Sequence, residues 1–161
     1  MLATVDLSRR SIGQCDDRTV LEEILPPHTL LAFAAMRELR TGLTGADFVA
    51  QVDTVQRRAG YRLVGAFSGK GVDAVAVAGF RVNTSLSWGR HVYIDDLSTA
   101  ASARRQGFAG QLLAWIHTEA DRLDCSQVHL DSGVGPDRQS AHRLYLNTGY
   151  AIYAHHFTRR G

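Results

Sequence analysis

The apolar residues follow a helical spacing in the front part of the chain and a strand pattern further on. Residues 19–39 keep the helical spacing, with Asp16 or Asp17 placed to cap a helix that Pro26-Pro27 then interrupts. A second helix is predicted over residues 45–59. Its expected cap and buried positions are Thr44, Phe48, Val52 and Val55. This front end reads as two helices of a scaffold or substrate wall.

From residue 61 onward, short apolar runs bounded by turn residues predict strands that alternate with helices. The predicted strands are residues 61–67, 72–82, 91–98, 128–132 and 150–157. The predicted helices are residues 105–123 and a segment from Asp137 or Gln139 to Asn147. This order indicates an α/β fold in which helices flank a central sheet of mixed direction.

Length and composition narrow the class of protein. The 161 residues predict one domain, of which residues 1–15 are loose or contribute a short edge strand. A net charge of +2 gives no electrostatic reason to expect a nucleic-acid or membrane partner. Cys15 and Cys125 lack metal-ligand spacing, so we expect reduced thiols and no metal, with one disulfide as the alternative. Without a signal-like or membrane-length apolar run, the expected location is the cytoplasm.

The most informative segment is residues 97–110, where a strand leads through a short loop into a long helix. Free N–H groups of a first helical turn and the helix dipole both favour a bound anion. Gly107 and Gly110 allow close approach of the main chain, while Arg104 and Arg105 add positive charge and forked donors. The segment therefore predicts a phosphorylated cofactor.

Residues 104–109, with the sequence RRQGFA, resemble the Gln/Arg-x-x-Gly-x-Gly/Ala motif of the GCN5-related N-acetyltransferase (GNAT) superfamily. Leu97 and Thr99 precede this motif as they do in the family, and a helix and strand follow it. Residues 141–150 then resemble the family's Ala-x-x-Leu/Phe-Tyr-x-x-x-Gly-Phe/Tyr segment. The resemblance extends over residues 61–157. The chain is similar in type to small bacterial members of the family.

The resemblance implies a GNAT fold with acetyl-CoA as co-substrate. The pyrophosphate would lie on the N–H groups of residues 105–110, and the pantetheine arm between the strands ending at residues 97–99 and 128–132. The implied cofactor-binding residues are Leu97, Ser98, Thr99, Arg104, Arg105, Gln106, Gly107, Phe108, Ala109 and Gly110.

Acyl transfer to an amine needs a neutral amine, a polarised carbonyl and a proton for the departing thiolate. Asp95 and Asp96 are candidates for assisting deprotonation of the amine, but a regular strand would turn only one of them into the site. The N–H of Leu97 is a candidate donor to the carbonyl. By the resemblance, Tyr145 is the general acid, with a phenol pKa of about 10.

These inferences predict direct acetyl transfer to a primary amine of a small molecule or peptide in a ternary complex. Neither cysteine lies in the motif segments, so no acetyl-enzyme is expected. The alternatives are a longer acyl-CoA, another acceptor, or a CoA-binding module without turnover. A single final strand, where many relatives have two, is compatible with strand exchange in a homodimer.

The acceptor itself stays open at this point. Its pocket is expected between the front helices and residues 83–90, including Trp88. The acidic pair favours a cationic amine, whereas nearby arginines equally favour an anionic substrate group. Those arginines are Arg81, Arg90 and Arg138, the last standing where many relatives carry asparagine.

Overall fold

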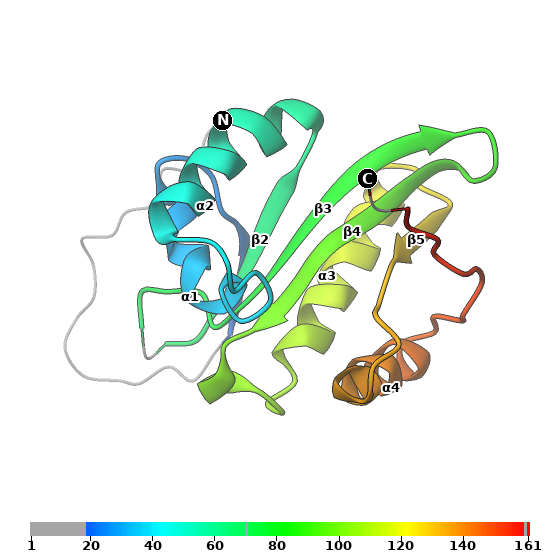
Figure 1. Ribbon diagram of the computed structural model, residues 1–161. Helices are drawn as coiled ribbons and strands as arrows, with labels where there is room; N and C mark the ends of the chain where they lie inside the picture. The colour runs from blue at the N-terminus through cyan, green and yellow to red at the C-terminus, as the bar shows by residue number, and fades with distance from the viewer. Residues whose placement is uncertain (1–18, 70, 160) are drawn as a thin grey trace.

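The computed structural model describes residues 19–69, 71–159 and 161, which are built around one five-stranded sheet (Figure 1). The strands follow the order β1-β2-β3-β4-β5, antiparallel from β1 to β4 and parallel between β4 and β5. The expected α/β fold with a mixed sheet is confirmed. The strands are β1 (Val20–Glu23), β2 (Arg62–Phe67), β3 (Ala76–Ser85), β4 (Gly89–Thr99) and β5 (Gln127–Leu130).

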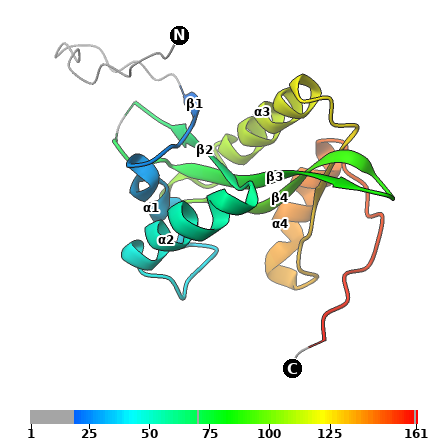
Figure 2. The ribbon, with the colours of Figure 1, turned by 90° about the horizontal axis from the view of Figure 1, so that it is seen from above.

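Helices cover both faces of the sheet (Figure 2). The first face is covered by η1 (His28–Ala32), α1 (Phe33–Met36), α2 (Gly45–Gln51), the π-helical turn η2 (Val52–Gln56) and η3 (Arg57–Ala59). The rest of the chain contributes η4 (Ala101–Ala103), α3 (Phe108–Arg122) on the second face, η5 (Pro136–Arg138) and α4 (Gln139–Asn147). None of the helices in the described part of the chain is long and apolar enough to cross a membrane.

Two apolar clusters hold the layers together. Phe80, Leu112 and Ile116 are fully buried between the sheet and α3. Met36 and Leu63 belong to the second cluster, between the sheet and the front helices. Burying each such side chain contributes roughly 1.5–3 kcal/mol. The sheet is therefore packed on both faces, and this packing fixes the position of β4.

The front of the chain differs in part from the prediction. The segment expected to begin a helix near residue 19 is strand β1, in which Val20 pairs with Phe67 and Glu23 with Val64. Pairing with the edge of β2 overrides the local helical spacing, and the alternating exposure of β1 suits an edge strand. The possible strand at residues 11–15 lies outside the described residues.

The helical segment after Thr44 is confirmed. The Thr44 hydroxyl accepts a hydrogen bond from the main-chain N–H of Asp47 at 3.2 Å, as a helix cap does. Phe48 and Val52 are buried as expected, but Val55 is exposed because the π-helical turn rotates it away from the sheet.

The strand predicted over residues 150–157 is wrong. Residues 150–159 have no regular secondary structure, and Ile152, Tyr153 and Phe157 are exposed. A segment with strand propensity forms a strand only when it pairs with a neighbouring strand or packs on an apolar surface, and residues 151–157 do neither. Within the described residues, β5 is therefore the last strand of the sheet.

Candidate active site

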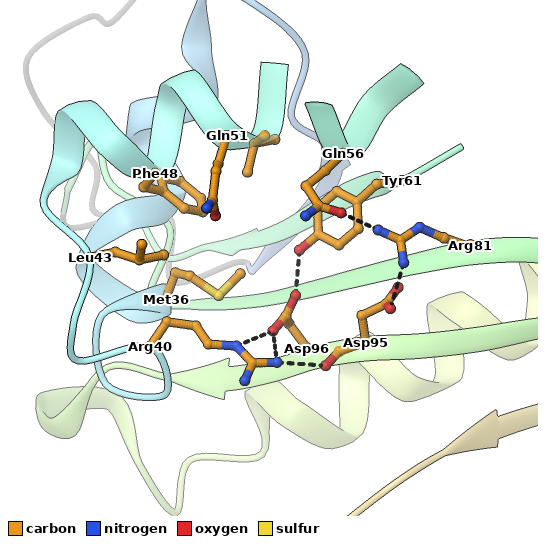
Figure 3. A pocket seen from close by; sticks show the side chains of 11 residues that line it. Met36, Arg40, Leu43, Phe48, Gln51, Gln56, Tyr61, Arg81, Asp95 and Asp96 are labelled. Carbon is orange, nitrogen blue, oxygen red and sulfur yellow. Dashed lines mark hydrogen bonds and ion pairs between the residues drawn. The ribbon is translucent and has the colours of Figure 1, made fainter. Parts of the chain in front are cut away.

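A β-bulge in β4 places both aspartates of the acidic pair on one face of the sheet. Gly79 of β3 pairs with Asp96, but the next residue, Phe80, pairs with Ile94, so Asp95 is an extra residue. A regular strand would have turned Asp95 and Asp96 to opposite faces. Both side chains instead line the same cavity (Figure 3). We expected at most one aspartate to enter the site if the strand was regular. The strand is not regular here, and both aspartates line the cavity.

This first cavity has a volume of about 280 Å³ and lies between the front helices and the sheet (Figure 3). Its helical wall is largely apolar and is formed by Met36, Leu43, Phe48 and Val52. Its sheet side is polar and is formed by Tyr61, Arg81, Asp95 and Asp96, with Arg40, Gln51 and Gln56 at its sides. The cavity therefore pairs an apolar wall with an acidic floor.

Asp96 has a partner on each carboxylate oxygen. The Tyr61 hydroxyl donates to Oδ2 at 2.8 Å, and Arg40 Nε donates to Oδ1 at 2.7 Å. Burial, followed by the charge of Asp96, raises the pKa of Tyr61, so this phenol stays a donor. A Cβ at Gly79 would overlap the Tyr61 ring, so glycine is required under the tyrosine. These contacts hold Asp96 in a fixed position.

Asp95 keeps one oxygen free of protein partners. Its Oδ1 accepts a hydrogen bond from Arg81 Nη1 at 2.8 Å, and Gln56 holds the same guanidinium from its other side. Asp95 Oδ2 is buried and has no hydrogen-bond partner among the described residues. Burial raises the pKa of Asp95, and the charge of Arg81 partly opposes this shift. Within the described residues, Asp95 is thus the carboxylate with an unpartnered acceptor oxygen and an increased affinity for a proton.

A second cavity, of about 190 Å³, opens where β4 and β5 diverge. Their pairing ends at Ile94 and Leu130, and the cavity lies beyond this point. Its lining includes Leu97, Leu130, Ser132, Gly133, Arg138 and Tyr145, together with Arg40 and Asp95. Because the first cavity is also lined by Arg40 and Asp95, the two cavities adjoin at these side chains.

Tyr145 reaches the second cavity from α4. Burial raises the pKa of its phenol, and the positive charge of Arg138 partly opposes this shift. Asp131 lines the same cavity and accepts a hydrogen bond from the Tyr93 hydroxyl at 2.5 Å. His129 instead stacks on Trp88, with 4.0 Å between ring centroids, and lines neither cavity.

The loop before α3 has the geometry of an anion site. Arg105 and Gly107 have positive φ angles of 62° and 87°, which turn the chain sharply before the helix. Within the described part of the chain, the N–H groups of residues 105–110 donate to no protein acceptor. A Cβ at Gly110 would meet only Leu144, at an ordinary 3.8 Å. The turn therefore requires Gly107, while Gly110 leaves room beside α4.

Other predicted cofactor residues have additional contacts. Arg104 Nη2 forms an ion pair with Glu38 at 2.7 Å and its side chain is half exposed. The Ser98 hydroxyl donates to the Ala35 carbonyl at 2.6 Å and is buried against α1. The Ser98 side chain thus anchors β4, which leaves only its main chain for a ligand.

The matching family model, described as the acetyltransferase (GNAT) family, extends over residues 30–150. The chain belongs to the GNAT acetyltransferase family. It is an acetyl-CoA-dependent N-acetyltransferase. The acetyltransferase is 29% identical to the uncharacterized N-acetyltransferase YhdJ of Bacillus subtilis (strain 168) over 129 residues. This alignment covers 80% of this chain and 88% of that protein.

Solved structures share the fold of the acetyltransferase. Aminoglycoside N-acetyltransferase AAC(6')-Iy in complex with CoA matches with a TM-score of 0.75 at 14% identity, over 89% of this chain and 95% of that chain. Glucosamine-6-phosphate N-acetyltransferase from Arabidopsis thaliana matches with a TM-score of 0.69 at 11% identity, over 89% and 98%. At these identities the likeness concerns the fold alone.

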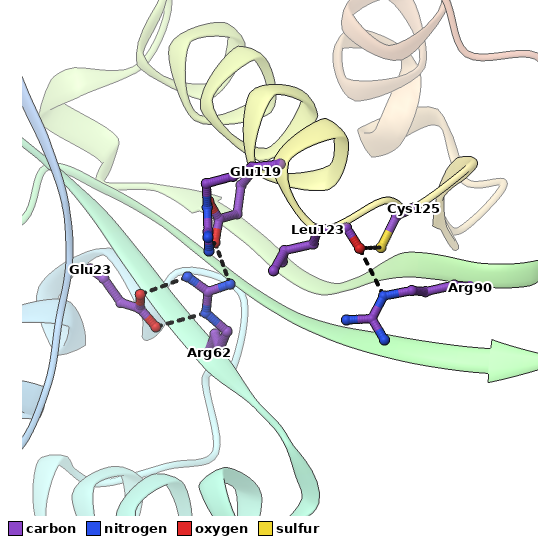
Figure 4. Close-up of polar contacts among 7 residues, drawn as sticks. Glu23, Arg62, Arg90, Glu119, Leu123 and Cys125 are labelled. Atoms are coloured by element: carbon purple, nitrogen blue, oxygen red, sulfur yellow. Dashed lines mark hydrogen bonds and ion pairs between the residues drawn. The ribbon is translucent and has the colours of Figure 1, made fainter.

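The hairpin between β3 and β4, which was expected to contribute to the acceptor pocket, lines neither of the two cavities. Trp88 and Arg90 line neither cavity. Arg90 Nε donates to the Leu123 carbonyl at 2.8 Å, near the buried Cys125 (Figure 4). Arg90 thus contacts the loop before β5, whereas Trp88 stacks on His129 of β5 itself.

Three residues of the candidate site were not identified from the sequence. Tyr61 was visible only as the first residue of a strand, and Gly79 as one small residue of a buried strand. Arg40 directly follows the segment with helical spacing, which ends at residue 39, and nothing local distinguishes it. Their contacts join positions 35 and 56 residues apart in the chain, which no local pattern reports.

Proposed function

We propose that this acetyltransferase transfers the acetyl group of acetyl-CoA directly to a primary amine of a small molecule, in a ternary complex. One observation carries the proposal: the two cavities adjoin at Asp95, whose buried Oδ2 has no protein partner among the described residues. The amine would occupy the first cavity and the thioester end of the cofactor the second. A cytoplasmic location and a homodimer stay predictions from the sequence.

The residues around the second cavity fit acetyl-CoA. The free N–H groups of residues 105–110 and the helix dipole of α3 would bind the pyrophosphate, with Arg104 and Arg105 beside it. The main chain of Leu97 and Thr99, beyond the end of the β4–β5 pairing, would bind the pantetheine arm. When bound, acetyl-CoA supplies an activated acetyl thioester. The remaining proposed contacts are Ser98, Gln106, Gly107, Phe108, Ala109 and Gly110.

Asp95 is proposed to bind the substrate ammonium and to take its proton. Its free Oδ2 would accept the hydrogen bond, and its raised pKa brings the carboxylate closer to a useful base. Asp96 is proposed as a positioning residue because Tyr61 and Arg40 already occupy both of its oxygens. The bulge thus gives adjacent aspartates different tasks.

Tyr145 is proposed to donate a proton to the departing thiolate. Its raised pKa keeps the phenol protonated at neutral pH, as an acid must be. The Leu97 N–H would donate to the thioester carbonyl as negative charge develops on its oxygen. Cys125 is buried beside Leu123 and lines neither cavity, which supports transfer without an acetyl-cysteine.

The test is a thiol-release assay with acetyl-CoA and a panel of primary amines, combined with mass spectrometry of both product and protein. We expect amine-dependent release of CoA, an N-acetylated amine, and no acetyl adduct on the protein before the amine is added. A stable acetyl-enzyme that is consumed by the amine would contradict direct transfer. Absence of thiol release with every amine would contradict the proposed function.

A further inference from the structure

The charges that line the first cavity are already paired with one another. Arg40 Nη2 lies 2.6 Å from Asp96 Oδ1, and Arg81 Nη1 lies 2.8 Å from Asp95 Oδ1. Two arginines and two aspartates therefore leave the lining without net charge. A bound anion needs an unpaired cation or a strong donor set when it loses its water. Asp95 and Gln56 engage the two terminal nitrogens of Arg81 and leave only its buried Nε–H unpartnered among the described residues, so an anionic substrate group would have to compete with Asp95 for this guanidinium.

Among the described groups that line the first cavity, Asp95 Oδ2 and Arg81 Nε are buried without a hydrogen-bond partner, so the cavity offers a charged ligand one carboxylate oxygen and one guanidinium N–H. Asp95 Oδ2 is buried and unpaired among the described residues, which suits one ammonium group. Asp96 has both oxygens occupied by Tyr61 and Arg40, so a second ammonium would have to displace one of these contacts. The floor of the cavity therefore fits one positive charge.

The wall opposite the acidic floor is apolar apart from the Gln51 amide (Figure 3). Phe48 and Val52 lie four residues apart and present one face of the α2–η2 segment to the cavity, and Met36 and Leu43 complete this wall (Figure 3). Burying apolar substrate surface there is favourable, whereas a charged group would be desolvated without compensation. At about 280 Å³, the cavity is at the small end of ligand pockets, which run from roughly 300 to 1,000 Å³.

We infer that the acceptor is a compact monoamine with an apolar alkyl or arylalkyl body, without a carboxylate, a phosphate or a second cationic group. This inference rests on the proposed acetyl transfer and on the placement of the amine at Asp95. The amine nitrogen binds to Asp95 Oδ2, and the body lies against Phe48, Leu43 and Met36. Amino acids, sugar phosphates and polyamines carry an additional charge for which the lining formed by the described residues has no free charge of opposite sign.

Matched amines test this inference on the unmodified protein. Phenethylamine and phenylalanine differ by one carboxylate, and butylamine and putrescine differ by one ammonium group. We expect kcat/KM to favour the first member of each pair by at least about tenfold, because the extra charge finds no free charge of opposite sign among the described lining residues. Phenethylamine, and not phenylalanine, should also raise the melting temperature of the protein in the absence of acetyl-CoA.

A variant of the apolar wall sharpens the test. Leu43→Arg puts an unpaired cation opposite the acidic floor, so it should lower the preference for phenethylamine over phenylalanine by about tenfold. Leu86→Arg, on the exposed tip of the β3–β4 hairpin, adds the same charge away from both cavities and should leave the preference unchanged. Retained CoA binding shows that Leu43→Arg is folded. If this variant does not fold, the matched amine pairs measured on the unmodified protein still test the inference.

The outcomes separate the inference from the proposed function. Faster turnover of phenylalanine, glucosamine 6-phosphate or putrescine than of the matched monoamines would overturn the substrate class while leaving acetyl transfer standing. Equal rates within both pairs would also overturn it. Absence of thiol release with every amine would overturn the proposed function, and the inference with it.

Discussion

Tyr61 occupies the space directly above Gly79, and this pairing of a tyrosine with a glycine on the neighbouring strand holds the acidic floor in place. The Tyr61 hydroxyl reaches across to Asp96 only because β3 has no side chain at position 79. The contact therefore connects the packing of the sheet to the geometry of the site.

Gly79→Ala is expected to destabilise the protein and to impair the site. The new methyl group would overlap the Tyr61 ring, and such overpacking typically costs about 1–3 kcal/mol of unfolding free energy. Denaturant unfolding measures this loss, and kcat/KM for the amine should fall as Tyr61 leaves Asp96. Gly42→Ala is the matched control, because a Cβ there meets no atom within 4 Å. Equal stability of the two variants would contradict the assigned contact.

The acid limb of the pH profile should report Asp95. The carboxylate must be ionised to bind an ammonium, so kcat/KM should fall as the pH drops through its pKa. Burial raises this pKa and Arg81 lowers it, so Arg81→Gln should move the acid limb to higher pH.

Arg90→Gln is the control for that shift, because Arg90 lies outside both cavities and should leave the profile unchanged. An acid limb that stays in place in Arg81→Gln, or that moves equally in both variants, would exclude Asp95 as its source.

Tyr145→Phe should lower kcat while leaving CoA affinity unchanged. Proton donation of this kind typically contributes about 10²–10⁴-fold to the rate. Tyr150→Phe is the matched control, because the Tyr150 hydroxyl contacts His117 at 2.9 Å and lines neither cavity. Steady-state kinetics and calorimetric CoA binding give both quantities. If the two variants lose the same small fraction of activity, Tyr145 is not the acid.

Glu119 should stabilise the fold above acidic pH. Its hydrogen bonds from Arg122 and then from Arg62, which also binds Glu23, lower its pKa from 4.5 to about 2 (Figure 4). A lowered pKa in the folded state gives stability that is present above pH 4.5 and is lost as the pH falls through about 2. Glu119→Gln should therefore cost about 1–3 kcal/mol at pH 7.

Urea unfolding at pH 7 and pH 2 measures this effect, with Asp121→Asn on the same helix as the control, since Asp121 forms no ion pair within the described residues. A Glu119→Gln penalty that is the same at both pH values would show that the stabilisation is not ionic.

The local parts of this site were readable in the sequence, whereas its tertiary parts were not. The turn before α3 follows from glycine at position 107, and the Thr44 cap follows from a hydroxyl placed before a helix. These features depend on neighbouring residues, so a linear pattern contains them.

The bulge at Asp95 depends instead on the register between β3 and β4, and β1 depends on the free edge of β2. The contact of Arg40 with Asp96 joins residues 56 positions apart. Such features arise from the packing of distant segments, which explains why the sequence alone leaves the choice between Asp95 and Asp96 open.

The central claim is that Asp95, rather than Asp96, handles the proton of the acceptor amine. It is tested most directly by the pH dependence of kcat/KM in Asp95→Asn and Asp96→Asn, with CoA binding measured in parallel. We predict that Asp95→Asn binds CoA normally, loses about 10²-fold or more in rate and loses the acid limb of the profile. Asp96→Asn should keep that limb at reduced activity. An acid limb that persists in Asp95→Asn and disappears in Asp96→Asn would contradict the account.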